Sequence, residues 1–228
     1  MKYLVKKLNY IKPYFVLILG FFLCALGWSL ILYANLGADP WVTFQKALSD
    51  LSGLSYGRIS QIIGIIIILS SIPLKIYPGI GTVLNMYFIG FFMDAIENSN
   101  LLFTPSMFIG KLAFLFLGMV LLGFGIWAYL KNGLGAGPRD GLMLGLVKKL
   151  NLSVAIVKTS IEVTVLVSGI LLGGPLGIGT VIAAFGNGLV LNKVFDIMKY
   201  DSKNTVQRTF LDEWENLKRK KDRELQEP

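Results

Sequence analysis

The sequence predicts an all-α membrane protein with six transmembrane helices in two inverted three-helix repeats, each with an additional half-helix or interfacial helix. Three observations support this fold class. The chain of 228 residues is 54% hydrophobic and only 16% charged, with a mean hydropathy of +0.63, whereas about a quarter of the residues in soluble domains are charged. Six apolar segments have about the length that crosses a hydrocarbon core. An internal repeat relates the first three segments to the last three.

The expected spans follow one another with short connections at equivalent places in the two repeats. They are Tyr14–Ala34, Ile59–Tyr77, Ile80–Ile96, Met107–Leu130, Val154–Leu172 and Ile178–Met198. The expected regions are therefore a basic N-terminus (1–13), a first membrane repeat (14–98), a second membrane repeat (107–198) and a charged amphipathic tail (199–228).

The repeat has a constant offset of 98 residues. Leu36-Gly37-Ala38-Asp39-Pro40 recurs as Leu134-Gly135-Ala136-Gly137-Pro138, and Ile80-Gly81-Thr82-Val83 recurs as Ile178-Gly179-Thr180-Val181. An offset that holds over such distant matches indicates duplication. Because each repeat has an odd number of spans, the second repeat must cross the membrane in the opposite direction to the first.

Lysine and arginine predict the orientation, because loops that remain in the cytoplasm carry more of both. With the N-terminus inside, the cytoplasm receives the N-terminal lysines, the basic tail and most basic loop residues, namely Lys75, Lys131, Arg139, Lys148 and Lys149. The outside receives Lys46, Arg58 and Lys111. We therefore expect a multi-pass protein of the cell (plasma) membrane with both termini in the cytoplasm.

Two short segments, Asp39–Leu51 and Gly137–Leu150, follow the first and fourth spans. Each follows a Gly-Ala pair and has a proline as its second residue, which the first turn of a helix tolerates. At about 13 residues they are too short and too polar for lipid-facing spans. They are expected to be either re-entrant half-helices or interfacial helices.

The stretch Gly133-Leu134-Gly135-Ala136-Gly137-Pro138-Arg139-Asp140-Gly141-Leu142 resembles the YczE/YitT group of bacterial integral membrane proteins. Leu36-Gly37-Ala38-Asp39-Pro40-Trp41 is a weaker copy of it. The resemblance covers about residues 14–198 and implies an uncharacterised membrane protein or transporter. The first copy has Trp41-Val42 where the second has Arg139-Asp140, so any function of that arginine and aspartate comes from the second half.

The two glycine-proline breaks are the first candidate site. A helix N-terminus after flexible backbone offers amide groups and a positive dipole to an anion, and paired broken helices often mark transporter sites. The alternative is a turn before a proline-started helix, with glycines that permit close packing. The residues concerned are Gly37, Pro40, Gly135, Gly137 and Pro138.

Glu162 is the second candidate, because it lies within the fifth span. A carboxylate there costs about 2.5–3.5 kcal/mol, so it should face protein or water and have a partner. Lys158, one turn earlier, is the expected partner. The pair either contributes to substrate binding or holds the bundle together. Arg139 likewise either binds an anionic group or anchors the cytoplasmic interface.

The remaining expected substrate-binding residues are Asp39, Asp140, Asn85 and Asn187. We expect the two breaks to approach each other, with Asp39, Arg139, Asp140 and Glu162 around a shared polar cavity. Other polar and aromatic residues have simpler interpretations. Asp94 and Asp196 are expected to be interfacial acids, and the tryptophans Trp28, Trp41 and Trp127 are expected to anchor the chain at the membrane surfaces.

The tail from Asp201 has apolar residues near helical spacing followed by lysines. This pattern predicts an amphipathic helix attracted to anionic lipid, and a solvated tail is the alternative. No nucleic-acid-binding fold accompanies its basic residues, so nucleic acid is not an expected partner.

Histidine is absent and Cys24 is the single cysteine, which removes the commonest general base and most metal-ligand and nucleophile combinations. We therefore expect no enzymatic activity and no cofactor or metal. Duplication and the paired breaks favour a transporter or permease for a small molecule whose identity the sequence does not specify. The alternative is a membrane organiser or assembly factor that anchors a cytoplasmic protein partner. A homo-oligomer is compatible with both.

Overall fold

A computed structural model of the chain describes residues 2–201, 205–215 and 218. Every secondary-structure element found in these residues is a helix, which confirms the all-α class. Their order along the chain is α1 (Lys2–Tyr33), α2 (Pro40–Ser52), α3 (Tyr56–Ser71), the 3-10 helix η1 (Ile72–Leu74), α4 (Ile80–Asn98), α5 (Phe108–Leu130), α6 (Pro138–Leu150), α7 (Val154–Leu171) and α8 (Ile178–Ile197).

The helix boundaries follow the sequence repeat. The starts of α6, α7 and α8 lie 98 positions after the starts of α2, α3 and α4. The two expected short helices are α2 and α6, each 13 residues long with proline at its start. The Asp39 side chain caps α2 by accepting hydrogen bonds from its first backbone amides. Gly137 occupies the same place before α6 and has no side chain that could accept from the amides of that helix. The two halves thus share their local structure but differ at this cap.

Helices α1 and α5 cross closely at paired glycines. A β-carbon added to Gly27 would lie 2.7 Å from the carbonyl oxygen of Gly118, and one added to Gly125 would lie 2.7 Å from that of Gly20. The two helices cross in antiparallel directions. Gly27 therefore meets Gly118, the repeat counterpart of Gly20, and Gly20 meets Gly125, the repeat counterpart of Gly27. Since only glycine permits this approach, the crossing fixes how the two halves meet.

The break before each short helix is held by the other half of the chain. The amide of Gly179, at the start of α8, donates to the carbonyl of Leu36 at 2.7 Å, and the amide of Gly81, at the start of α4, donates to Leu134 at 2.7 Å. Gly37 and Gly135 have φ angles of 92° and 118°, a backbone region that favours glycine.

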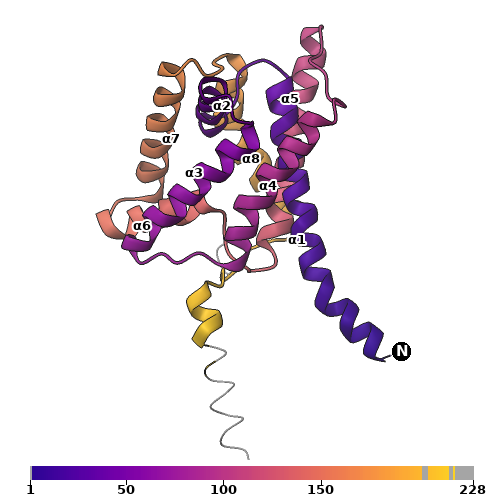
Figure 1. Cartoon of the computed structure of the whole chain (residues 1–228), viewed down its shortest axis with the longest axis vertical. Coiled ribbons are helices and arrows are strands. Elements are labelled where there is room, and N and C mark those ends of the chain that lie inside the picture. Colours follow the sequence, from indigo (N-terminus) through magenta and orange to yellow (C-terminus); the bar gives the residue numbers. More distant parts are fainter. Residues whose placement is uncertain (1, 202–204, 216–217, 219–228) are drawn as a thin grey trace, which may run out of the picture.

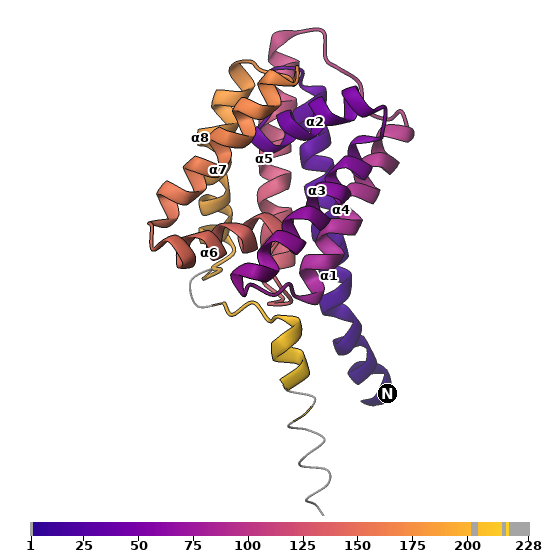
Figure 2. The ribbon, with the colours of Figure 1, turned by 60° about the vertical axis from the view of Figure 1, so that its left-hand side comes forward.

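The helices form two groups (Figures 1 and 2). One contains α1, α4, α5 and α8, with α1 packed against both α4 and α5, and α5 also packed against α8. The other contains α2, α3, α6 and α7, in which α2 packs on α7 and α3 packs on α6. Figure 2 places α2 near the upper end and α6 near the lower end, so the two short helices lie at opposite ends of the molecule.

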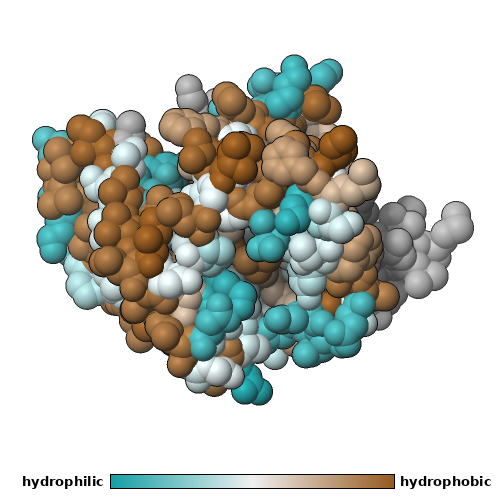
Figure 3. All heavy atoms as spheres, turned by 90° about the horizontal axis from the view of Figure 1, so that it is seen from above, coloured by the Kyte–Doolittle hydropathy of each residue, from teal (hydrophilic) through white to brown (hydrophobic). Residues whose placement is uncertain are grey.

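Five helical segments of the described chain are long and apolar enough to cross a membrane, namely Pro13–Tyr33, Tyr56–Leu74, Ile80–Asn98, Phe108–Leu130 and Ile178–Ile197. Helix α7, the remaining expected span, is not among them, so the count of six stays a prediction. Large apolar side chains such as Ile66, Phe185 and Leu189 are exposed, and apolar areas extend to the edge of the outline seen from above (Figure 3). Such exposure suits a lipid environment.

The described part of the tail is only partly helical. Residues 205–209 have no helix, because their backbone and side chains bond to loops instead: Arg208 donates to Gly133 at 2.9 Å, and the following Phe210 donates to Pro78 at 2.9 Å. Helix is present from Phe210 to Glu215. The rest of the expected amphipathic helix, at 202–204, 216–217 and 219–228, lies outside the described residues.

Candidate functional site

A cavity of about 310 Å³ lies between the two groups of helices and is lined by both halves of the chain. The start of α2 contributes Asp39, Pro40 and Trp41, and the start of α6 contributes Gly137, Pro138, Arg139 and Asp140. Helix α7 adds Lys158 and Glu162, and Asn85 and Asn187 come from α4 and α8. Much of the remaining wall is apolar, including Ile89, Met119, Leu122 and Met143.

The two helix starts present different charge environments to the cavity. At α2, the Asp39 carboxylate accepts hydrogen bonds from the amides of Trp41 and Val42, both at 3.1 Å. This carboxylate offsets the positive end of the α2 dipole. At α6, Gly137 supplies no such group. The acid of its first turn is Asp140, so this carboxylate and any anion that enters the cavity share the positive end of α6.

The guanidinium of Arg139 lies against two indole rings, with its central carbon 4.7 Å from the ring centre of Trp41 and 5.3 Å from that of Trp28. Among the described residues, its side chain forms no ion pair or hydrogen bond. Contact with aromatic rings stabilises the cation and leaves guanidinium N–H groups for a planar anionic partner.

Asp140 projects near Gly137, Asn85 and Tyr129. From a β-carbon built on Gly137, the distances are 3.5 Å to Asp140 Oδ2, 3.6 Å to Asn85 Oδ1 and 3.6 Å to the Tyr129 hydroxyl. The Asp140 side chain also lacks an ion pair or hydrogen bond within the part of the chain that the structure describes. Desolvation by the surrounding protein raises the pKa of its carboxyl, while the charges of Arg139 and Lys158 act in the opposite direction.

Lys158 and Glu162 form the expected pair on α7, with Lys158 Nζ 3.8 Å from Glu162 Oε1. Two residues of the cavity wall have a buried polar atom, Trp28 Nε1 and Asn187 Oδ1, for which the described residues offer no hydrogen-bond partner. A buried polar atom left unpaired costs about 1–3 kcal/mol. A ligand that accepts from the indole and donates to the amide would remove this penalty.

The walls of the cavity differ between the two halves. In the first half α3 packs against α4: Asp94 on α4 accepts from the Ser55 hydroxyl at 2.6 Å and from the Gly57 amide at 2.7 Å, both at the start of α3. In the second half, close packing of α7 against α8 is absent from the described contacts. A β-carbon at Gly90 would lie 2.5 Å from the Gly57 carbonyl, whereas its counterpart Gly188 faces open space.

The structure brings together all seven charged and amide residues that the sequence analysis selected, with Pro40, Gly137 and Pro138. It does not bring Gly37 and Gly135 to the cavity wall. These glycines lie instead in the loops before α2 and α6, each of which is hydrogen-bonded to a helix of the other half. Trp28 and Trp41, expected at the membrane surface, line the cavity against Arg139. Sequence reasoning also missed Gln45 and Tyr129, and it assigned Asp94 to the interface rather than to the contact between α3 and α4.

The set of side chains is suited to binding rather than to metal coordination. Within the described residues, no three His, Cys, Asp or Glu side chains are grouped as metal ligands would be. Cations, carboxylates, amides and apolar side chains converge instead on one cavity, which is the usual composition of a small-molecule site.

A family model described as a family of unknown function, DUF6198, matches residues 11–195. The "Uncharacterized membrane protein YczE" of Bacillus subtilis is 38% identical over 174 residues, which cover 75% of this chain and 80% of that protein. An "Uncharacterized protein" of Haemophilus influenzae is 34% identical over 187 residues, covering 82% of this chain and 85% of the relative. No solved structure matches the chain. The relatives confirm the resemblance to the YczE group.

Proposed function

This chain belongs to DUF6198, a family of unknown function, and we propose that it is a small-molecule transporter built from two inverted membrane repeats. The observation that carries the proposal is the cavity lined by both halves, because both broken helix starts meet there together with Arg139 and Asp140, which form no ion pair with any residue that the structure describes. Transporters with inverted repeats bind substrate at this place, near the middle of the membrane between the repeats.

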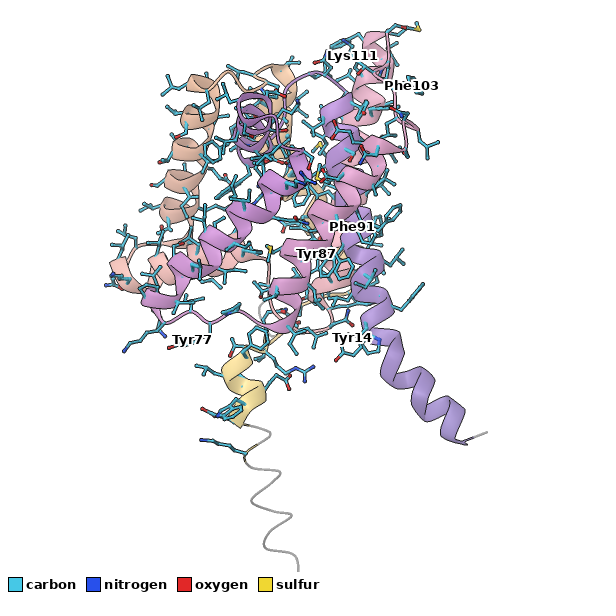
Figure 4. All side chains as sticks on the ribbon, in the orientation of Figure 1. Tyr14, Tyr77, Tyr87, Phe91, Phe103 and Lys111 are labelled. Atoms are coloured by element: carbon cyan, nitrogen blue, oxygen red, sulfur yellow. The ribbon has the colours of Figure 1, made fainter. Side chains whose placement is uncertain are left out.

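The proposed membrane topology has six spans, with α7 added to the five long apolar segments. Both described ends of the chain lie at the lower end in Figures 1 and 2, together with α6 and the loop that carries Tyr77, whereas Phe103 and Lys111 lie at the upper end (Figure 4). The lower end includes Lys148 and Lys149 of α6. Because loops in the cytoplasm carry an excess of lysine and arginine, we assign the lower end to the cytoplasm.

The difference between the two halves supports alternating access. Near the upper end, Asp94 holds the start of α3 against α4, and in the proposed cycle this contact closes the cavity on that side. At the repeat counterpart of this contact, near the lower end, α7 is separated from α8. In the proposed cycle this arrangement is the inward-open state. Closing α7 onto α8 and releasing α3 from α4 exchanges the conformations of the repeats and opens the opposite side.

Transport is tested with purified protein in proteoliposomes and a broad panel of metabolites, under a proton gradient and under a substrate gradient. The proposal predicts saturable accumulation of at least one solute. Empty liposomes and liposomes with a Gly188→Val variant are the controls, because a side chain at Gly188 would obstruct closure of α7 on α8. Failure of every solute under both gradients would overturn the carrier. Co-purification with an ATPase would instead indicate a substrate-binding subunit of a larger importer.

The alternative function, a membrane organiser, is favoured by one observation: Phe210, Leu211 and Trp214 expose apolar side chains on the described part of the tail. Deleting the whole tail does not separate the two functions, since residues 207–210 bond to the loops around Pro78 and Gly133. Deleting residues 211–228 keeps those bonds. A transporter should then retain flux, whereas an organiser should lose its partner in a pull-down.

A further inference from the structure

We propose that the cavity binds a small zwitterion that carries a carboxylate and an ammonium group on an apolar body, as an aliphatic amino acid does. This inference rests on the proposed function and specifies the substrate of the same site. It follows from which charged side chains of the cavity already have partners and which do not.

Five charged side chains line the cavity, and three of them are engaged. Asp39 accepts from the first amides of α2, and Lys158 lies 3.8 Å from Glu162. The remaining two are one cation, Arg139, and one anion, Asp140, neither of which has an ion pair or side-chain hydrogen bond among the described residues. Adjacent positions on a helix point about 100° apart, so they are poorly placed to neutralise each other.

The charge of the ligand follows from these two groups. A purely anionic ligand would leave Asp140 without a partner, and a purely cationic ligand would leave Arg139 without one. Arg139 is half-buried and Asp140 is exposed, and both line the cavity, so a ligand with both charges is the one that gives each of them a complementary partner. The formal charge of the cavity is unchanged when such a ligand binds.

The position of each ligand group follows from the surrounding geometry. The carboxylate belongs at Arg139, where the guanidinium fork favours a planar negative group. The ammonium belongs at Asp140, beside the oxygen atoms of Asn85 and Tyr129. The apolar body lies against Met119, Leu122 and Met143. A cavity of about 310 Å³ is at the small end of the range for small-molecule sites, in agreement with a ligand of this size.

The test measures thermal stabilisation of the full-length purified protein by three matched pools of probes at millimolar concentration. The first contains L-leucine, L-isoleucine, L-valine and L-methionine, the second contains their amides, which are cations, and the third contains their N-acetyl derivatives, which are anions. We expect the amino acids to raise the melting temperature and the singly charged pools to have little effect. Equal stabilisation by a singly charged pool, or none by the amino acids, would overturn the assignment.

Two variants locate the charges. Arg139→Gln should weaken binding of the amino acids by at least about 30-fold and favour the amides, whereas Asp140→Asn should weaken it similarly and favour the N-acetyl derivatives. Arg58→Gln and Asp50→Asn are the matched controls, because both residues are exposed and outside the cavity. If Arg139→Gln does not fold, Arg139→Lys retains the charge without the bidentate fork and should bind with intermediate affinity. Unchanged selectivity in the folded variants would also contradict the proposal.

Binding and flux can fail separately. Amino acids that bind but are not moved into proteoliposomes would contradict the transporter and leave the ligand assignment intact. Saturable flux of a singly charged solute, without amino-acid binding, would support the transporter and contradict the zwitterion.

Discussion

The first half of the chain, α1 to α4, and the second half, α5 to α8, have matching helix boundaries but different helix packing. The start of α3 is bound to α4 by Asp94, whereas α7 is packed on α2 and separated from α8. Two sequence differences lie at this place: Gly57 has Ala155 as its counterpart, and Asp94 has Asn192. The two halves therefore pack differently around one cavity, and under the proposed function this difference is the asymmetry that alternating access requires.

The contact that both halves share should be the most sensitive to substitution. Gly27→Leu and Gly125→Leu each place a side chain against backbone of the opposite helix, since the first added carbon would lie 2.7 Å from a backbone atom in either case. Backbone cannot move aside cheaply, so each variant should lose about 3 kcal/mol of stability or more. Thermal unfolding in detergent measures the loss, with Gly188→Leu as the control in open space. A large difference between the two variants would contradict the equivalence of the halves at this crossing.

The next comparison substitutes the same residue at counterpart positions that differ in packing. Gly90→Val should lower stability by about 1–3 kcal/mol, because the new side chain would push α3 away from α4. Gly188→Val should change stability by no more than about 0.5 kcal/mol, because that position faces open space. Unfolding midpoints test both values. If Gly188→Val were as destabilising as Gly90→Val, α7 and α8 would already be in close contact.

Asp94→Asn converts the contact in the first half to the residue type of the second half. A neutral amide replaces a carboxylate that accepts two hydrogen bonds, at 2.6 and 2.7 Å, so the contact between α3 and α4 should weaken by about 1 kcal/mol. The expected result is a larger population in which α3 has moved from α4. In a Cys24→Ala background, a Ser60→Cys reporter on the cavity wall should react faster with an impermeant maleimide from the upper side.

The matched control for this variant is Asp50→Asn. Asp50 is an exposed acid of the same half that pairs with Lys46 on the surface, so its loss should have almost no effect. An unchanged maleimide rate in Asp94→Asn would show that this carboxylate does not hold the upper side closed.

Local signals in the sequence predicted the repeating elements well. A glycine followed by proline specifies a turn and a helix start through backbone geometry alone, so α2 and α6 could be placed within one residue of their observed starts. The same repeat predicted that both breaks would face one cavity, and this holds for the helix starts at Pro40, Gly137 and Pro138 but not for Gly37 and Gly135.

Contacts between distant segments were less predictable. A tryptophan near the end of a span has the same local pattern whether it anchors the chain at the membrane surface or lines a cavity, so Trp28 and Trp41 could not be connected to Arg139. Asp94 likewise resembles an ordinary acid at a helix end, and its partners Ser55 and Gly57 are 39 and 37 residues away. The asymmetric packing of α3 and α7 depends on tertiary arrangement, which a shared sequence pattern does not reveal.

The smallest expected effect concerns the tail, whose described part bonds to Gly133 and Gly135 of the second half and to Pro78 of the first. Just before its helical part, the backbone amide and hydroxyl of Thr209 donate to Asp212 Oδ2 at 2.7 and 2.8 Å, and these bonds lower the pKa of the Asp212 carboxyl. A carboxyl with a lowered folded pKa stabilises the folded tail above its unfolded pKa of about 3.9. The contribution is lost as pH falls through the folded pKa of Asp212.

Amide hydrogen exchange at residues 210–215 should therefore become faster below about pH 4, after correction for intrinsic rates. Asp212→Asn should exchange faster at neutral pH and lose most of this pH dependence, and an unchanged wild-type pH profile in that variant would show that Asp212 does not hold the turn.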